Sequence, residues 1–391
     1  MNLTTMPIIK DFLDEDDILR FTITNIDVSF VNAIRRTILS DINVCCIEFD
    51  SNGVDNKSID ITVNTGRLHN EILKHRLSCI PVYVKEDNIM SQSVMEKFCQ
   101  ENILEIDCHN DSDVSVFVTT KDFRVKNLST GKYLDNTTIF PPNQITNDYI
   151  DFSRLRPKIS DTIPGESLKL TAKFSISNAS KNSAHNVVSL CSYSNTLDEK
   201  AIKTKWSVME TDLKSSNLSE EAILFEKTNF RHLDANRCFM ANSFDFQIQS
   251  ICVLTNREIV TLSIYHLLNR FQSFLELLDT NQVTTLVSES TIPFSFDVQL
   301  YDEDYTFGKI LEYLLYHHFY LSMTLSYCGF KKFHPHDTKS VIRVAFPSLP
   351  SPSLLDEILR ECCTLAVSTL QSVMKQGIDL TRDRENIQED N

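Results

Sequence analysis

Glycine is scarce in this sequence, and the scarcity limits the chemistry that the chain can perform. Only 7 of 391 residues are glycine, and neither G-x-G-x-x-G nor G-x-x-x-x-G-K-[ST] occurs. Such loops bind phosphate groups because glycine lets backbone N–H groups approach them closely. The G-x-S-x-G and H-E-x-x-H motifs of hydrolases and zinc proteases are also missing. These absences argue against the common nucleotide-binding enzymes and hydrolases.

Clustered positive charge and long apolar runs are missing as well. The net charge is −15, and consecutive basic residues never exceed a pair. Nucleic-acid affinity depends on clustered cations that displace counterions, so we expect no direct sequence-specific nucleic-acid binding. No apolar stretch approaches the roughly 20 residues that span a bilayer, which predicts no membrane association. The opening "MNLTTMPIIKDFLDEDD" turns acidic where a signal peptide is apolar, so we expect an intracellular protein.

The cysteines do not form a metal-binding pattern. There are 11 of them, scattered along the chain with no CxxC. Cys99 with Cys108 and His109 comes nearest to a cluster, but the spacing matches no common zinc motif. The histidines at 317–318 and 334–336 lack carboxylates or thiols at ligand spacing. We therefore expect reduced, buried thiols, no metal and no cofactor bound by this chain.

The first 80 residues combine strands with an amphipathic helix. Residues 18–26 alternate apolar and polar side chains, as a half-buried strand does. Asp27 can cap the helix predicted from 28 to 42, whose apolar stripe includes Phe30, Ile34 and Ile38. A strand at 58–64 and a helix beginning near residue 66 follow.

Arg35 and Arg36 lie in the middle of that first helix. Two interpretations compete for them, a solvated helix face or a surface that docks on a larger protein. Guanidinium groups pair with carboxylates through two parallel hydrogen bonds, which suits a rigid interface. The helix by itself does not decide between the two interpretations.

The middle and the end of the chain suggest an insertion followed by a repeat. Residues 86–240 are rich in Asn, Ser, Thr and Asp with short strand-like runs, although 200–240 shows no clear period. A strand at 243–251 precedes a helix at 257–278 and a polar stretch that we interpret as a linker. Residues 293–319 then repeat the order strand, acidic turn and helix, and a strand at 340–346 and a helix at 351–374 follow.

The sequence therefore predicts an α+β fold with two related modules in one chain. Packed together, the apolar faces of their helices would form one shared core. The predicted boundaries are 1–85 with 241–280 for the first module, 86–240 for a β-rich insertion, 281–292 for the linker, 293–376 for the second module and 377–391 for a flexible tail. The predicted module interface consists of Phe30, Ile34, Ile38, Leu267, Phe271, Phe307, Leu311, Leu314, Leu359 and Leu370.

Several motifs in order resemble the α-like subunits of multisubunit DNA-directed RNA polymerases. The first module carries "NIDVSFVNAIRRTIL" and "RLHNEILKHRLSCIPV", and residues 164–190 resemble a further family motif. These parts are similar to the third-largest subunit of the eukaryotic polymerase II type, with bacterial α and archaeal D relatives. Residues 293–375, with "DYTFGKIL", "GFKKFHP" and "IRVAF", are similar to its eleventh-subunit partner, related to archaeal L. The family's cysteine-rich zinc loop is not present.

The resemblance implies a fusion of two subunits and a non-catalytic role in transcription. It implies an assembly scaffold that docks the largest and second-largest polymerase subunits, along with small subunits. Asn32, Arg35, Arg36, His75 and Arg76 would be the docking residues, and the catalytic magnesium would belong to the largest subunit. A fused chain of this kind is expected in a large DNA virus, acting in the host cytoplasm, in a viral factory or in the virion, with the nucleus as the alternative.

Two other functions remain open at this stage. The chain is a stand-alone enzyme if a catalytic site lies in the 86–240 insertion. It is a homodimeric interaction protein if the modules exchange between two chains instead of pairing within one.

Overall fold

The computed structural model describes residues 6–49, 58–84, 90–160, 162–216, 218–251, 253–351 and 353–388, with side chains described as far as Gln376. Over these residues the fold is α+β, and the chain divides into two compact units. Unit 1 comprises Met1–Thr37, Leu190–Gln249 and Ser263–Asn391, and unit 2 comprises Ile38–Ser189 and Ser250–Leu262. Among the described residues no helix combines the length and the apolar character needed to cross a bilayer.

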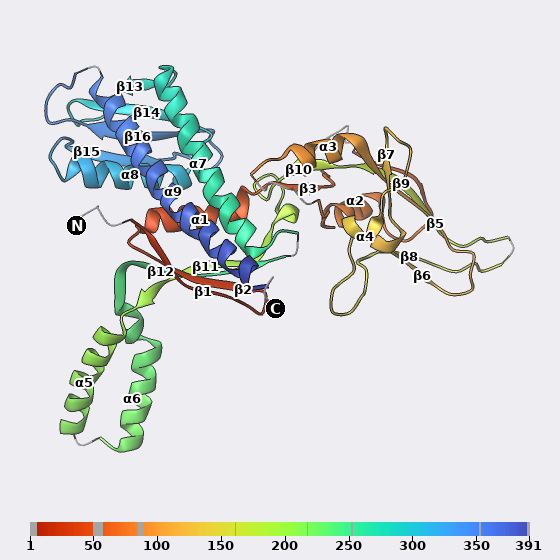
Figure 1. Ribbon diagram of the computed structural model, residues 1–391, viewed down its shortest axis with the longest axis horizontal. Helices are drawn as coiled ribbons and strands as arrows, with labels where there is room; N and C mark the ends of the chain where they lie inside the picture. The colour runs from red at the N-terminus through yellow and green to blue at the C-terminus, as the bar shows by residue number, and fades with distance from the viewer. Residues whose placement is uncertain are drawn as a thin grey trace. The chain divides into compact units, whose positions relative to one another are not determined.

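The first sheet of unit 1 has four strands in the order β1-β2-β12-β11 (Figure 1). They are β1 (Ile8–Glu15), β2 (Ile18–Thr24), β12 (Phe239–Ser250) and β11 (Val188–Leu197). The alternation predicted for β2 is present, because every second side chain is buried. Phe21 of β2 pairs with Phe246 of β12 in the antiparallel register, and their rings stack with centroids 5.0 Å apart. Strand β1 was not predicted from the sequence.

The second sheet of unit 1 is antiparallel, in the order β13-β14-β16-β15. Its strands are β13 (Thr285–Val287), β14 (Ser295–Tyr301), β16 (Lys339–Ala345) and β15 (Tyr327–Lys331). The predicted linker, 281–292, therefore contains an edge strand. Its side chains are exposed, so they leave no apolar alternation in the sequence to signal it.

Two strand-to-helix turns in unit 1 are built alike. Strand β2 leads into α1 (Val28–Ser40), and β14 leads into α8 (Tyr305–Leu315). Two residues before each N-cap, Asn25 and Asp302 adopt left-handed backbone conformations, with φ of 61° and 57°. Asn and Asp tolerate this region better than most residues. Each cap then accepts a backbone hydrogen bond, Asp27 from Ser29 N at 2.8 Å and Asp304 from Thr306 N at 2.9 Å. The repeat seen in the sequence is therefore also a repeat of local geometry.

Two long helices accompany these turns, α7 (Asn256–Asp279) and α9 (Leu354–Gln388), and a π-helical turn, Tyr316–Tyr320, extends α8. The backbone of α9 is helical through most of the tail expected at 377–391, and residues 389–391 lie outside the described residues. Helix α8 packs closely on β15. A Cβ atom added to Gly308 would lie 2.2 Å from the ring of Phe330, so this position in α8 requires glycine.

Residues 199–232, which showed no clear pattern in the sequence, form a helical hairpin in unit 1. It consists of α5 (Glu199–Ser215) and α6 (Glu220–His232), which project from the first sheet in Figure 1. Ser219 caps α6 through the backbone N–H of Ala222, and Trp206 packs on Phe230 with ring centroids 5.6 Å apart. The hairpin belongs to unit 1, whereas the sequence placed it in the insertion predicted at 86–240.

Unit 2 is mainly β-sheet, and among the described residues three short α-helices lie wholly within it. Its central sheet has the order β4-β9-β5-β7, and two smaller sheets pair β10 with β3 and β6 with β8. The strands are β3 (Val44–Cys46), β4 (Ile59–Asn64), β5 (Asn102–His109), β6 (Val116–Thr119), β7 (Arg124–Asn127), β8 (Asp151–Leu155), β9 (Ser167–Lys173) and β10 (Ser175–Ser177). The helices are α2 (Asn70–Ser78), α3 (Ser93–Glu101) and α4 (Asn136–Ile139).

Candidate functional site

Helix α1 buries its apolar stripe, and Arg35 lies outside this stripe at a half-buried position. Phe30, Ile34 and Ile38 are each at most 2% exposed. Arg35 is half-buried and donates from Nε and from a terminal nitrogen to Asn32 Oδ1, at 3.2 and 2.9 Å. Its partner among the described residues is thus a neutral amide oxygen of the same helix, and no carboxylate there pairs with the guanidinium. Two of the predicted docking residues therefore form one local pair.

Arg36 contacts the second half of the same chain. Its Nε donates to Thr306 Oγ1 at 2.8 Å, and a terminal nitrogen forms an ion pair with the Asp304 carboxylate. The two side chains of the ion pair are 38% and 32% exposed, so solvent screens the attraction in part. The sequence predicted Arg36 as a contact to another protein, whereas the structure shows internal contacts for its guanidinium.

Asp304 is the centre of a small network of charges. Arg270 of α7 forms an ion pair with Glu303, and the same arginine lies 3.5 Å from Asp304 Oδ1. Burial of Asp304 favours the neutral acid, but hydrogen bonds from Thr306 and the charge of Arg36 outweigh it. The pKa of Asp304 is therefore below its usual value. One carboxylate thus caps α8 and binds α1 at the same time.

Aromatic rings join the same helices in the core of unit 1. Phe307 of α8 stacks on Phe271 of α7 with centroids 4.4 Å apart and meets Phe274 edge-on at 5.3 Å. Phe30 of α1 meets Tyr313 of α8 edge-on at 6.4 Å. Aromatic pairs in these geometries add about 0.5–1.5 kcal/mol beyond the area that they bury. Helix α8 is therefore held to both α1 and α7.

The residues predicted at the module interface are all buried, with exposed fractions of 3% or less. They are Phe30, Ile34, Ile38, Leu267, Phe271, Phe307, Leu311, Leu314, Leu359 and Leu370.

Further polar contacts involve the two ends of the chain and the two long helices. Gln376 of α9 accepts from Ile9 N at 2.9 Å and donates to the carbonyl of Pro7 at 2.6 Å. Arg360 of α9 forms an ion pair with Asp279, the last residue of α7, at 3.0 Å. Helix α9 therefore contacts both the first strand and α7.

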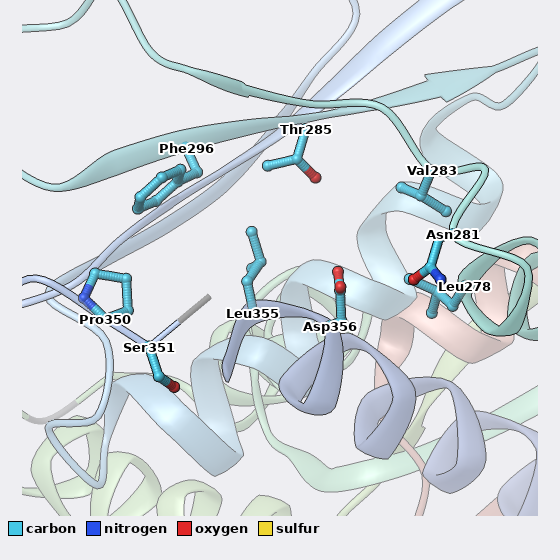
Figure 2. Close-up of a pocket in the computed structure, with 9 residues that line it drawn as sticks. All are labelled: Leu278, Asn281, Val283, Thr285, Phe296, Pro350, Ser351, Leu355 and Asp356. Carbon is cyan, nitrogen blue, oxygen red and sulfur yellow. The ribbon is translucent and has the colours of Figure 1, made fainter. Parts of the chain in front are cut away.

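The described part of unit 1 has hollows on its surface. One, of about 370 Å³, is bordered by Asn32 at the α1 side and by Lys309, Tyr313 and Tyr316 at the α8 side. Another, of about 300 Å³, lies where α7 ends and α9 begins, with Leu278 and Leu355 among its walls (Figure 2). The first hollow places Asn32 next to Tyr313 and the exposed Tyr316. Tyrosine is enriched in protein–protein interfaces.

The remaining predicted docking residues, His75 and Arg76, belong to α2 of unit 2. Arg76 donates to the carbonyls of Phe152 and Asp151 at 2.8 and 2.9 Å, which ties α2 to β8. The His75 ring packs edge-on against Phe49 with centroids 4.7 Å apart. Both side chains therefore have a structural role within unit 2, and Arg76 also borders a groove on its surface.

Within the described residues no group of three or more His, Cys, Asp and Glu side chains is arranged to hold a metal ion. Cys99 lies against Cys45 with sulfur atoms 3.7 Å apart. His109 binds Asp111 and the hydroxyl of Ser167, at 2.7 and 2.6 Å.

Sequence reasoning missed three residues of the charge network, Arg270, Glu303 and Asp304. Asp304 precedes a helix at an N-cap position, which is a recognisable signal. Its pairing with Arg36 joins residues 268 positions apart and has no local signature. Arg270 is one of several charged side chains in α7, and its sequence position alone does not distinguish it from the others.

Comparisons with known proteins give one relevant similarity. No family model matches the chain. A stretch of 66 residues is 33% identical to DNA-directed RNA polymerase subunit Rpo3 of Thermococcus kodakarensis. The stretch is 17% of this chain and 22% of Rpo3, so the chain spans about a fifth of the length of the relative that it matches. The match supports a relationship to RNA polymerase subunits.

Proposed function

We propose that the chain is a non-catalytic subunit of a DNA-directed RNA polymerase, in which two α-like modules are fused and pair with each other. The first module contributes α1 and α7, and the second contributes α8 and α9. The stack of Phe271 on Phe307 carries the proposal, because it brings together helices from the two predicted modules. The similarity to Rpo3 and the repeated strand-to-helix turns give independent support.

In this proposal the paired modules form an assembly platform for the largest and second-largest subunits. Arg35 is the docking residue that the geometry favours, because its guanidinium has only a neutral partner among the described residues and remains able to bind a carboxylate. Asn32 positions that guanidinium. Arg36, His75 and Arg76 support the fold in this proposal. The fusion, the viral origin and the place of action inferred from the resemblance remain predictions.

The test is purification of a tagged copy from the cells in which the protein is made. We expect two very large polymerase subunits to co-purify with it, and the isolated chain to synthesise no RNA. Arg35→Glu should leave the thermal unfolding curve within a few degrees of wild type and reduce co-purification of the second-largest subunit at least tenfold, because a carboxylate at the interface would then meet a like charge.

Arg231→Glu is the matched control, since Arg231 is an exposed arginine on the α5–α6 hairpin. It makes the same charge change and should leave co-purification unchanged. Normal incorporation of the Arg35→Glu protein would refute the docking role of Arg35. Absence of both large subunits from the wild-type sample would refute the function itself.

A further inference from the structure

Four arginines converge on one groove of unit 2, although the chain as a whole carries a net charge of −15. The groove has a volume of about 500 Å³ and lies between α2 and the β6–β8 pair. Arg67 and Arg76 come from the α2 side, and Arg154 and Arg156 come from β8 and the residues after it.

Two of these arginines already have fixed partners. Arg156 forms an ion pair with Glu166, whose side chain is 8% exposed, so its charge is largely neutralised. Arg76 donates to two backbone carbonyls, as described above, and these carry no net charge. Arg76 is therefore held rigidly in the wall of the groove, and among the described residues it forms no ion pair.

The other two arginines are exposed, and among the residues that the structure describes neither forms an ion pair. Arg154 lies directly across the strand pair from Phe117, and its guanidinium sits 5.2 Å from the centre of that ring. This contact orients the guanidinium without neutralising it. Arg67 precedes α2 on the opposite side of the groove. Asp151 is the acidic residue in the lining, so the groove carries a net positive charge.

An apolar groove of about 430 Å³ continues from the first and shares Arg76 and Asp151 with it. Ile72, Ile80 and Ile150 line this second groove. Ile72 and Ile150 are 49% and 42% exposed, which leaves aliphatic surface open to solvent beside the positive charge. The two grooves together offer guanidinium groups at one end and aliphatic side chains at the other.

We propose that this double groove binds a segment of a partner protein that carries acidic side chains next to aliphatic or aromatic ones. Carboxylates would pair with Arg67, Arg76 and Arg154, and the apolar side chains would cover the isoleucines. A nucleic acid fits less well, because the aliphatic half offers nothing to phosphates and the net negative charge of the chain repels a polyanion. The proposal uses unit 2 alone and does not depend on the polymerase assignment.

The test begins with selection of random 16-residue peptides displayed on phage against the full-length chain. We expect the enriched peptides to combine Asp or Glu with Leu, Ile or Phe. A fluorescein-labelled synthetic copy of the most enriched peptide is then titrated with the chain by fluorescence anisotropy. Arg67→Glu with Arg154→Glu should weaken its binding at least tenfold, because two attractive charges become repulsive. Raising the salt from about 0.05 to about 0.5 M should also weaken it.

Two further variants separate the alternatives. Lys121→Glu with Lys132→Glu makes the same charge change on exposed residues outside both grooves and should alter binding less than twofold. Ile72→Ser should weaken binding three- to tenfold without changing the charge. Should the glutamate pair impair folding, Arg67→Ala with Arg154→Ala provides the same readout.

Three results would overturn the proposal. They are the absence of any enriched acidic peptide, equal binding by wild type and the arginine variants, and tighter groove-dependent binding of a labelled single-stranded oligonucleotide than of the peptide.

Discussion

Replacing Phe307 by alanine should weaken the attachment of the second half of the chain to the first. Phe307 is fully buried, and its ring contacts Phe271 and Phe274 of α7 at 4.4 and 5.3 Å. Truncation of a buried phenylalanine costs about 3–5 kcal/mol. Part of that cost falls on packing between α8 and its own sheet, so we assign about half or more of it to the contact with α7.

The assay measures attachment directly. A protease site placed between Gln282 and Val283, in the turn after α7, allows the folded chain to be cut into two pieces that stay associated. The part assigned to α7 is then about 1.5–5 kcal/mol, and since about 1.4 kcal/mol is a factor of ten, its loss weakens association roughly 10- to 4000-fold. The dissociation constant of the cut protein can be followed by analytical ultracentrifugation or by labelled-fragment exchange.

Phe333→Ala provides the matched control, because Phe333 lies in the same fragment and is 62% exposed. It should leave the dissociation constant unchanged. If Phe307→Ala changes association by less than about threefold, the core of unit 1 does not depend on the aromatic contact, and the paired-module proposal loses its main support. Fragments that are soluble, folded and indifferent to each other would refute that proposal directly.

Three more measurements test other parts of the structure. Asp304→Asn should weaken association of the cut protein at pH 7 by removing the charge that pairs with Arg36. Folding lowers the pKa of Asp304, so the stabilisation that its negative charge gives is fully present above the unfolded-state pKa, near 4. This stabilisation is lost as the pH falls through the lower pKa of the folded state. The difference between variant and wild type should therefore vanish at low pH. Arg76→Met should destabilise unit 2 by about 1–3 kcal/mol, because it removes two hydrogen bonds to β8, and faster amide hydrogen exchange at Phe152 would report it. His185 is 4% exposed, its ring nitrogens lack hydrogen-bond partners among the described residues, and burial lowers its pKa, so unit 2 should lose stability as the pH falls below about 6.5.

Each of these three expectations has a clear contrary result. An Asp304→Asn effect that persists undiminished at pH 3 would show that the carboxylate charge is not the cause. Unchanged exchange at Phe152 would show that the Arg76 hydrogen bonds do not hold β8. For His185, the variant His185→Phe should reduce the loss of stability between pH 7 and pH 5, and an unchanged loss would assign it to other groups.

Much of unit 1 was readable from the sequence because its elements have buried faces. Strand β2 alternates strictly, and the stripe on α1 follows a clean helical period with Asp27 at its start. The repeat of this plan near residue 300 was visible for the same reason. Burial imposes a period on the residue types, and a period can be recognised in a single sequence.

Elements without a continuous buried face were missed. The α5–α6 hairpin leaves Val208, Leu224 and Phe225 exposed at 60–65%, so its apolar residues do not mark one face. Strand β13 has three exposed residues in a polar stretch. The extent of unit 2 also differed from the expected insertion, because a compact unit is defined by contacts and not by a change in composition.

The sequence alone determined the α+β class, the repeated strand-to-helix plan and the list of helix positions that are buried, since each depends on local periodicity and capping. Only the tertiary structure decided what the charged residues do. It placed Arg36 against Asp304, 268 positions away, and Arg76 against the carbonyls of β8, and it gathered arginines from separate elements around one groove. Ion pairs and grooves of this kind depend on distances in space between residues far apart in the chain, and no local pattern encodes those distances.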